Sequence, residues 1–216
     1  MNRIFNRYYF AGVGSGCLLS ILLVMGAGAA SYYFAQSMMD EKSGGSGGGP
    51  LALRAPDFPS SDQALAAEGE ADWDWELATL EGESVTLGEF QGQIVFLNLW
   101  ATWCGPCKRE LPNVQRLYNT MKDKGVVFLI VSKEDPGTVQ GWLADQEYDM
   151  PFYIRTGSAP ADLSSRAIPA TFIIDHEGTV VFKETGSRAW DDESTVDFLD
   201  RLLADAGEYS EGGAAL

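Results

Sequence analysis

Two of the three cysteines of this chain are spaced for chemistry: Cys104 and Cys107, in the stretch W-A-T-W-C-G-P-C-K-R-E-L-P. A nearly continuous apolar run at 94–100 precedes them and apolar residues at helical spacing follow, so the pair is expected where a buried strand turns into a helix. A helix N-terminus offers unpaired N–H groups and a positive dipole end, which favour a thiolate. We therefore predict that Cys104 is the nucleophile, with a pKa that can fall from about 8.5 towards about 7 or below, and that Cys107 is the resolving thiol.

A zinc site and a structural disulfide are the two other uses of such a pair. Zinc would need two more ligands, and the part of the chain after the N-terminal apolar run offers only His176 and no further cysteine. A structural disulfide is possible in an exported protein, but a bridge that closes so small a loop would constrain the unfolded chain very little. The sequence thus favours reversible dithiol–disulfide exchange, without a metal or an organic cofactor.

The longer pattern around the cysteines resembles the active-site segment of thioredoxin-fold proteins, specifically the TlpA/ResA-like branch of membrane-anchored thiol-disulfide oxidoreductases. The similarity spans roughly residues 73 to 206 and includes L-x-G-x-x-V-x-L-x-x-F-x-G at 80–92 and I-P-A-T-F-I-I-D at 168–175. Such long patterns are far more specific than a lone C-x-x-C. The resemblance implies a thioredoxin fold, which is an α/β fold with a central mixed β-sheet flanked by helices, and dithiol–disulfide exchange outside the cytoplasm.

The same resemblance assigns residues beyond the cysteines. Pro169 matches a proline that in this family is cis and lies against the active-site disulfide, and the Ile168 backbone is then expected to pair with an extended substrate segment. Glu110 matches a glutamate that ResA-like proteins carry near the cysteines, although a surface glutamate in a salt bridge is the alternative. Asn98 stands where thioredoxins themselves have a buried aspartate, and an amide cannot act as a base. Glu110 is therefore the candidate catalytic group for proton removal from Cys107.

The residues next to the first cysteine are assigned to the substrate-contact surface. They are Trp103, Gly105 and Pro106, and Pro106 also fits the first turn of a helix because it lacks an N–H group that would be unpaired there. Trp100 is expected to pack in the core instead. His176 lies in a predicted turn between two strands, and no Ser or Cys motif points to it as a catalytic base.

The elements that must position these residues alternate along the chain. Strands are predicted near 73–78 and at 84–86, 94–100, 126–132, 171–174 and 179–183, and the last two should form a hairpin. Helices are predicted at 104–122 with Pro112 inside, after the cap Asp135-Pro136 with Val139 in the buried stripe, and at 192–204. This alternation, ending in a hairpin and a helix, is typical of layered α/β domains.

Residues 1–42 read as a membrane anchor. Arg3 and Arg7 precede a run at 8–35 that has no charged residue, and about 20 apolar residues suffice to span a bilayer. A cleaved signal peptide with the small-residue site at 27–29 is the alternative, but the run continues through aromatic residues at 32–34, which favours a retained anchor. The positive-inside rule then places the N-terminus in the cytoplasm and the catalytic domain in the periplasm or an equivalent space, as a single-pass protein of a bacterial inner membrane.

Three further segments complete the predicted organisation. Residues 43–72, which begin S-G-G-S-G-G-G-P, read as a flexible linker with a reach of roughly 30 Å. Residues 73–207 form the thioredoxin-like domain, and 208–216 read as a flexible acidic tail. The formal net charge of −16 argues against nucleic acid as a partner and suits either a basic substrate or a high-salt habitat.

The resemblance implies a membrane-anchored enzyme that reduces protein disulfides, with apocytochrome c in cytochrome c maturation as one client and a membrane thiol-electron donor as partner. Thioredoxin also has Gly-Pro between its cysteines, and its reduction potential is about −270 mV, whereas that of the oxidant DsbA is about −120 mV. The Gly-Pro pair therefore favours a reductant. The alternatives are a net oxidant of secreted proteins and a redox-silent, client-binding thioredoxin-fold module. Intact cysteines argue against the last.

Overall fold

The computed structural model of this protein describes residues 52–60 and 65–213, with side chains described as far as residue 207. The predicted anchor at 1–42 and the Gly-rich start of the predicted linker lie outside these residues. Among the helices of the described ranges, none is both long and apolar enough to cross a membrane.

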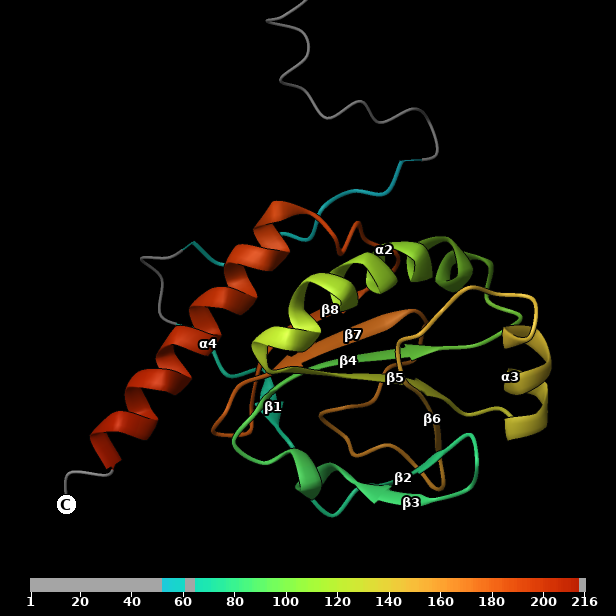
Figure 1. The fold of residues 1–216 in the computed structure, drawn as a ribbon, viewed down its shortest axis with the longest axis horizontal. Coiled ribbons are helices and arrows are strands. Elements are labelled where there is room, and N and C mark those ends of the chain that lie inside the picture. The colour runs from blue at the N-terminus through green and yellow to red at the C-terminus, as the bar shows by residue number, and fades with distance from the viewer. Residues whose placement is uncertain (1–51, 61–64, 214–216) are drawn as a thin grey trace, which may run out of the picture. The chain divides into compact units, whose positions relative to one another are not determined.

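The described chain forms a mixed sheet of eight strands in the order β1-β8-β7-β4-β5-β6-β2-β3 (Figure 1). The strands are β1 (Gly69–Glu70), β2 (Glu76–Thr79), β3 (Ser84–Thr86), β4 (Ile94–Trp100), β5 (Val126–Ser132), β6 (Phe152–Arg155), β7 (Ala170–Ile174) and β8 (Thr179–Thr185). β4, β5 and β6 run parallel, and every other neighbouring pair is antiparallel. The mixed sheet and the β7–β8 hairpin expected from the sequence are confirmed.

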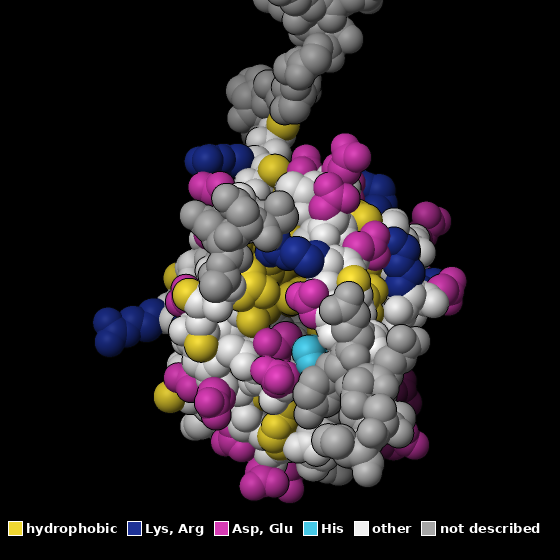
Figure 2. All heavy atoms as spheres, turned by 90° about the vertical axis from the view of Figure 1, so that its left-hand side faces the viewer, with side chains coloured by type: hydrophobic (Ala, Val, Ile, Leu, Met, Phe, Trp, Pro, Cys, Tyr) yellow, Lys and Arg dark blue, Asp and Glu magenta, His cyan; other side chains and the backbone are white. Residues whose placement is uncertain are grey.

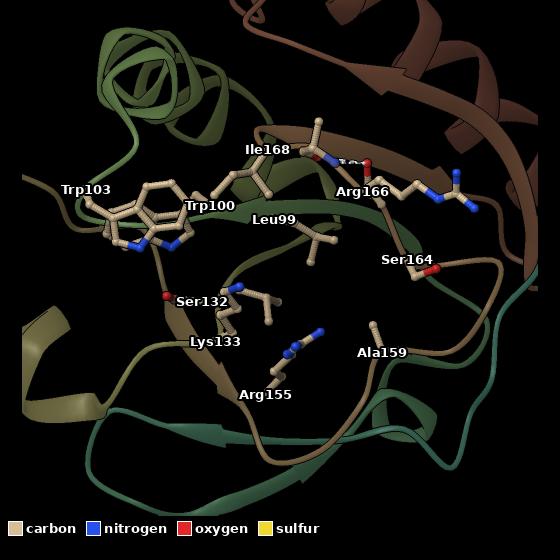
Figure 3. Close-up of a pocket in the computed structure, with 13 residues that line it drawn as sticks. Leu99, Trp100, Trp103, Ser132, Lys133, Arg155, Ala159, Ser164, Arg166 and Ile168 are labelled. Carbon is tan, nitrogen blue, oxygen red and sulfur yellow. Dashed lines mark hydrogen bonds between the residues drawn. The ribbon is translucent and has the colours of Figure 1, made fainter.

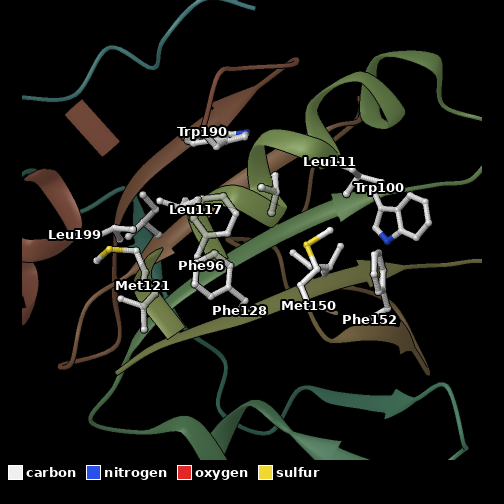
Figure 4. Close-up of a cluster of buried hydrophobic side chains, with 14 of the residues drawn as sticks. Phe96, Trp100, Leu111, Leu117, Met121, Phe128, Met150, Phe152, Trp190 and Leu199 are labelled. Carbon is white, nitrogen blue, oxygen red and sulfur yellow. The ribbon is translucent and has the colours of Figure 1, made fainter. Parts of the chain in front are cut away.

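Helices pack against this sheet so that β4 is buried on both faces. They are α2 (Gly105–Met121), α3 (Pro136–Leu143) and α4 (Glu193–Gly213), with short 3-10 turns at Leu87–Phe90 and Lys122–Lys124. Phe96 of β4 faces the cluster beneath α2 that Figure 4 shows, together with Leu117 and Phe128. Val95 and Leu97 belong to a second cluster, as the alternation of side chains along a strand requires. The continuous apolar run at 94–100 therefore predicted a central strand correctly.

Several predicted boundaries differ from the structure. β2 starts at Glu76 rather than near residue 73, and α4 continues to Gly213, into the expected tail. β6 was not predicted, because its four residues follow Pro151 in what reads as a loop. α2 contains Pro112, as predicted.

The predicted linker at 43–72 is not free along its described part. Residues of β1 pair with β8, and the backbone N–H of Glu68 donates to the carbonyl oxygen of Val180 at 2.7 Å. The Phe58 ring stacks on that of Phe198 with centroids 4.4 Å apart. The prediction of a flexible linker was wrong for these residues, because a composition rich in Pro, Ser and Ala gives no sign of the Phe58 ring contact or of the two-residue strand β1.

Candidate active site

Cys104 and Cys107 form a disulfide at the start of α2, with Cα atoms 5.2 Å apart. β4 ends at Trp100, and Cys104 is the residue that caps α2: the backbone N–H of Cys107 points at its Sγ at 3.1 Å. Pro106 lies in the first turn, where its missing N–H leaves no partner unsatisfied. The predicted position of the pair, between a buried strand and a helix, is confirmed.

The two cysteines differ slightly in exposure. Cys104 is 4% exposed, whereas Cys107 is fully buried among the core side chains. An incoming disulfide can therefore approach Cys104 before it can approach Cys107. This asymmetry fits the assignment of Cys104 as the attacking thiol.

The peptide bond between Ile168 and Pro169 is cis and lies directly before β7. The carbonyl oxygen of Ile168 is 3.7 Å from Cys104 Sγ, a van der Waals contact, since a disulfide sulfur has no hydrogen to donate. Pro169 is itself buried. The Ile168 backbone thus borders the more exposed cysteine, where the resemblance places it.

Glu110 is fully buried, so the alternative of a surface glutamate in a salt bridge is wrong. Its Oε1 accepts a hydrogen bond from Asn98 Nδ2 at 2.9 Å. Its Oε2 accepts two more, from the backbone N–H of Arg188 and from Trp190 Nε1, both at 3.1 Å. The carboxyl group therefore joins α2 to β4 and to the segment before α4, one helical turn after Cys107.

Burial raises the pKa of Glu110 from its ordinary value of 4.5 to about 7. Loss of hydration disfavours the charged form, and the donors from Asn98, Arg188 and Trp190, with the charge of Arg188, only partly offset that loss. Both protonation states are consequently accessible near neutral pH. Such a carboxyl can take up a proton and give it back.

Asn98 is part of this network rather than a separate departure from the thioredoxin pattern. Its Nδ2 also donates to Thr171 Oγ1 at 2.9 Å, and the two residues face each other in the β4–β7 register. Its Oδ1 has no hydrogen-bond partner among the described residues. Turned over, the amide would offer that oxygen to a protonated Glu110, so Asn98 can serve either state of the carboxyl.

The predicted contact residues lie around the first cysteine. Trp103 is 64% exposed and stands at the mouth of a cleft that Figure 3 shows, while Gly105 is half-buried and Pro106 is exposed. Trp100 is buried in the core, as predicted. His176 lies in the turn between β7 and β8, at the other end of β7 from the cis peptide.

Sequence reasoning missed three members of the Glu110 network: Thr171, Arg188 and Trp190. Each is more than 70 residues from its partner in the chain. Only the fold brings them together, Thr171 through the β4–β7 pairing and Arg188 and Trp190 through the segment between β8 and α4, and the spacing of residue types carries no signal for it.

Residues 69–183 match the AhpC/TSA family. The thiol-disulfide oxidoreductase ResA of Halalkalibacterium halodurans is 34% identical to this chain over 148 residues, which cover 68% of this chain and 83% of that protein. The ResA of Bacillus cereus is 32% identical over 113 residues, which cover 50% of this chain and 64% of that protein, less than two thirds of its length.

Two solved structures resemble the described fold. A crystal structure described as a thiol:disulfide interchange protein DsbE from Chlorobium tepidum aligns with a TM-score of 0.57 and 27% identity, and covers 65% of this chain and 99% of its own. One described as a thiol-disulfide oxidoreductase from Bacteroides vulgatus aligns with a TM-score of 0.54 and 26% identity, and covers 66% and 99%. The thioredoxin fold that the sequence resemblance implied is confirmed.

Because Glu110 is buried, its contribution to the free energy of unfolding should depend on pH. Because its folded-state pKa is raised, the folded protein holds an extra proton between about pH 4.5 and about pH 7, and the stability due to this group is lost as pH rises through that window. We expect the free energy of unfolding of the wild type, minus that of Glu110→Gln, to fall by roughly 3 kcal/mol from about pH 4 to about pH 8. Urea unfolding of the oxidised protein measures the difference without thiol titration.

Glu81→Gln is the matched control, because Glu81 is exposed in the turn between β2 and β3. It removes one negative charge without touching the network. A difference for Glu110→Gln that stays constant or rises with pH would show that the folded-state pKa of Glu110 is not raised above its unfolded value, contrary to the prediction.

Proposed function

Because the chain belongs to the AhpC/TSA family and, within it, to the ResA-like thiol-disulfide oxidoreductases, we propose that it reduces protein disulfides outside the cytoplasm. The observation that carries the proposal is the arrangement of the Cys104–Cys107 disulfide, with Cys104 4% exposed and Cys107 fully buried one helical turn from a buried carboxyl group. A redox-silent client-binding module would not need this arrangement.

The reduction proceeds in two exchanges. The thiolate of Cys104 attacks one sulfur of a client disulfide, and the other client sulfur leaves as a thiolate and takes up a proton. Cys107 then loses its proton and attacks Cys104 Sγ, which releases the second client thiol and leaves the disulfide present in this structure. The client gains two electrons and two protons, and the protein loses them.

Glu110 takes the proton from Cys107 in the second exchange. Cys107 is fully buried, so bulk water does not reach its thiol directly, and Glu110 is the buried carboxyl closest to it along α2. A group whose pKa lies near the working pH suits both uptake and release of a proton. Asn98 holds the carboxylate in place and is a positioning residue.

The client segment lies extended beside the Ile168 backbone, in the manner of strand addition, with Trp103 and Pro106 on its other side. The uncharged run at 8–35 supports an anchor in the inner membrane and a periplasmic location, and a membrane thiol-electron carrier would recharge the dithiol. Apocytochrome c is one client that the ResA-like relationship implies.

Replacing the resolving thiol should trap clients. Without Cys107 the mixed disulfide on Cys104 has no internal thiol to release it, so Cys107→Ser should accumulate adducts, and Cys104→Ser should not. Non-reducing electrophoresis followed by mass spectrometry measures the adducts and shows whether apocytochromes are among them. Trapping by Cys104→Ser instead would reverse the assigned roles.

Removing the carboxyl should slow the second exchange specifically. We expect Glu110→Gln to reduce the rate of mixed-disulfide resolution by about 10²-fold, the low end of the range for a positioned base, because thiols need less help than hydroxyls. In the wild type the rate should rise as pH increases through about 7, where Glu110 ionises, and this inflection should be absent in the variant. Stopped-flow rates between about pH 5 and about pH 10 measure both, with Glu81→Gln as the control.

The direction of the reaction is tested by the reduction potential. Gly105 and Pro106 separate the cysteines as in thioredoxin, so equilibration with glutathione should give a value nearer to about −270 mV than to about −120 mV. A potential as oxidising as that of DsbA would favour the alternative function, net oxidation of secreted proteins.

A further inference from the structure

The charged side chains that line a cleft next to Ile168 are all positive, and the nearest carboxylate in the hydrogen-bond network is that of Glu134, which accepts from Ser132 of the lining at 3.1 Å. The volume of the cleft is about 180 Å³, and Trp103 and Ile168 line it together with Lys133, Arg155 and Arg166 (Figure 3). No Asp or Glu side chain lines it, although the chain has 31 acidic residues and only 15 Lys and Arg. By contrast, acidic side chains are spread over the face that Figure 2 shows, which carries His176. The cleft is thus a local exception to the charge of the whole protein.

The three cations come from separate segments that meet at this cleft. Lys133 directly follows β5, Arg155 is the last residue of β6, and Arg166 lies in the loop before the cis peptide. In the part of the chain that the structure describes, the ion pairs involve other cations, and none of these three has a carboxylate partner. Figure 3 shows Arg155 pointing into the space between its strand and that loop. Their charge is therefore available to a ligand.

Ile168 contacts both the cleft and the disulfide. It lines the cleft, and its carbonyl oxygen is the atom that lies 3.7 Å from Cys104 Sγ. An extended chain rises about 3.3 Å per residue, so a client bound through its cysteine at Cys104 would bring the next few side chains over the cleft. The volume is below the roughly 300–1,000 Å³ of pockets that enclose a whole small molecule, and it suits one or two side chains of a passing segment.

We propose that this cleft selects client segments that carry an acidic side chain within a few residues of the reactive cysteine. The proposal rests on the proposed function, because it concerns the substrate of the same site. Arginine pairs with a carboxylate through two parallel hydrogen bonds, and Arg155, which points into the cleft, can supply this geometry, with Arg166 and Lys133 as further charges on the lining.

The net charge of −16 leads to the opposite expectation, a basic substrate. Charges more than about 8 Å apart in water are largely screened at physiological ionic strength, so distant carboxylates act weakly on a bound segment. The cations that line the cleft act at contact distance. Local charge should therefore override the charge of the whole protein once the client is bound.

The test compares three disulfide-containing peptides of otherwise identical sequence, with Glu, Gln or Lys flanking the cysteine, as substrates of the reduced full-length protein. We expect the Glu peptide to have a kcat/KM roughly tenfold above that of the Gln peptide, and the Lys peptide to be the poorest substrate. Each of Arg155→Gln, Arg166→Gln and Lys133→Gln should lower the advantage of the Glu peptide by about two- to fivefold and leave the Gln peptide unchanged. The triple variant should abolish the advantage.

Lys124→Gln is the control, because it removes one positive charge at the opposite end of β5, roughly 20 Å from Lys133. It should not change the ratio between the peptides. Arg155 belongs to a strand, so if its variant does not fold, Arg166→Gln in the exposed loop decides the question.

The outcomes distinguish a failure of the proposed function from a failure of the role proposed for the cleft. Failure to reduce any of the peptides would overturn the proposed function itself. Reduction of all three at equal rates, or fastest reduction of the Lys peptide, would leave the reductase intact and overturn the role of the cleft. If the arginine variants lost activity only on glutathione disulfide and kept it on the peptides, the cleft would serve a small disulfide rather than a protein client. That result would also overturn the proposal.

Discussion

The buried carboxyl group of Glu110 is the constraint on which the arrangement of the active site depends. Removing a carboxylate from water is costly unless hydrogen bonds replace its hydration, and here the donors come from β4 and from the segment that leads into α4. α2 cannot shift on the sheet without breaking these bonds. The helix that carries both cysteines is thus held in register by the same group that we propose as the proton acceptor of Cys107.

Local patterns in the sequence predicted what is local in the structure. The bounds of β3, β4 and β5 were predicted correctly because each is a β-branched or apolar run between turn residues, and the cysteine pair was placed correctly because it lies where such a run meets a helical pattern. β1 and β6 were missed, since β1 has only two residues and lies in a stretch that reads as a linker, and β6 follows Pro151 in a stretch that reads as a loop. The cis peptide at Ile168–Pro169 followed from the family resemblance, not from any local preference.

The Glu110 network was only half predictable. The resemblance marked Glu110, and the amide at Asn98 stood out as a departure from thioredoxin, but their hydrogen bond depends on how α2 lies across β4. The charge of the cleft could not be predicted for the same reason: the composition gives a net charge of −16 for the chain and cannot show that three cations from distant segments line one cleft. Net charge and local charge are separate properties, and only the fold relates them.

The edges of the sheet differ in how much backbone they leave unpaired. The outermost strands, β1 and β3, are two and three residues long. Long exposed edges offer rows of unpaired N–H and C=O groups onto which unfolded chains, or other copies of the same protein, can add and aggregate. Edges this short offer few such groups, but β1 covers only Thr179 and Val180 of β8 and leaves the rest of that strand without a strand partner on its outer side among the described residues. The edge that stays available for strand addition is therefore the end of β8 that pairs with the start of β7, directly after the cis peptide.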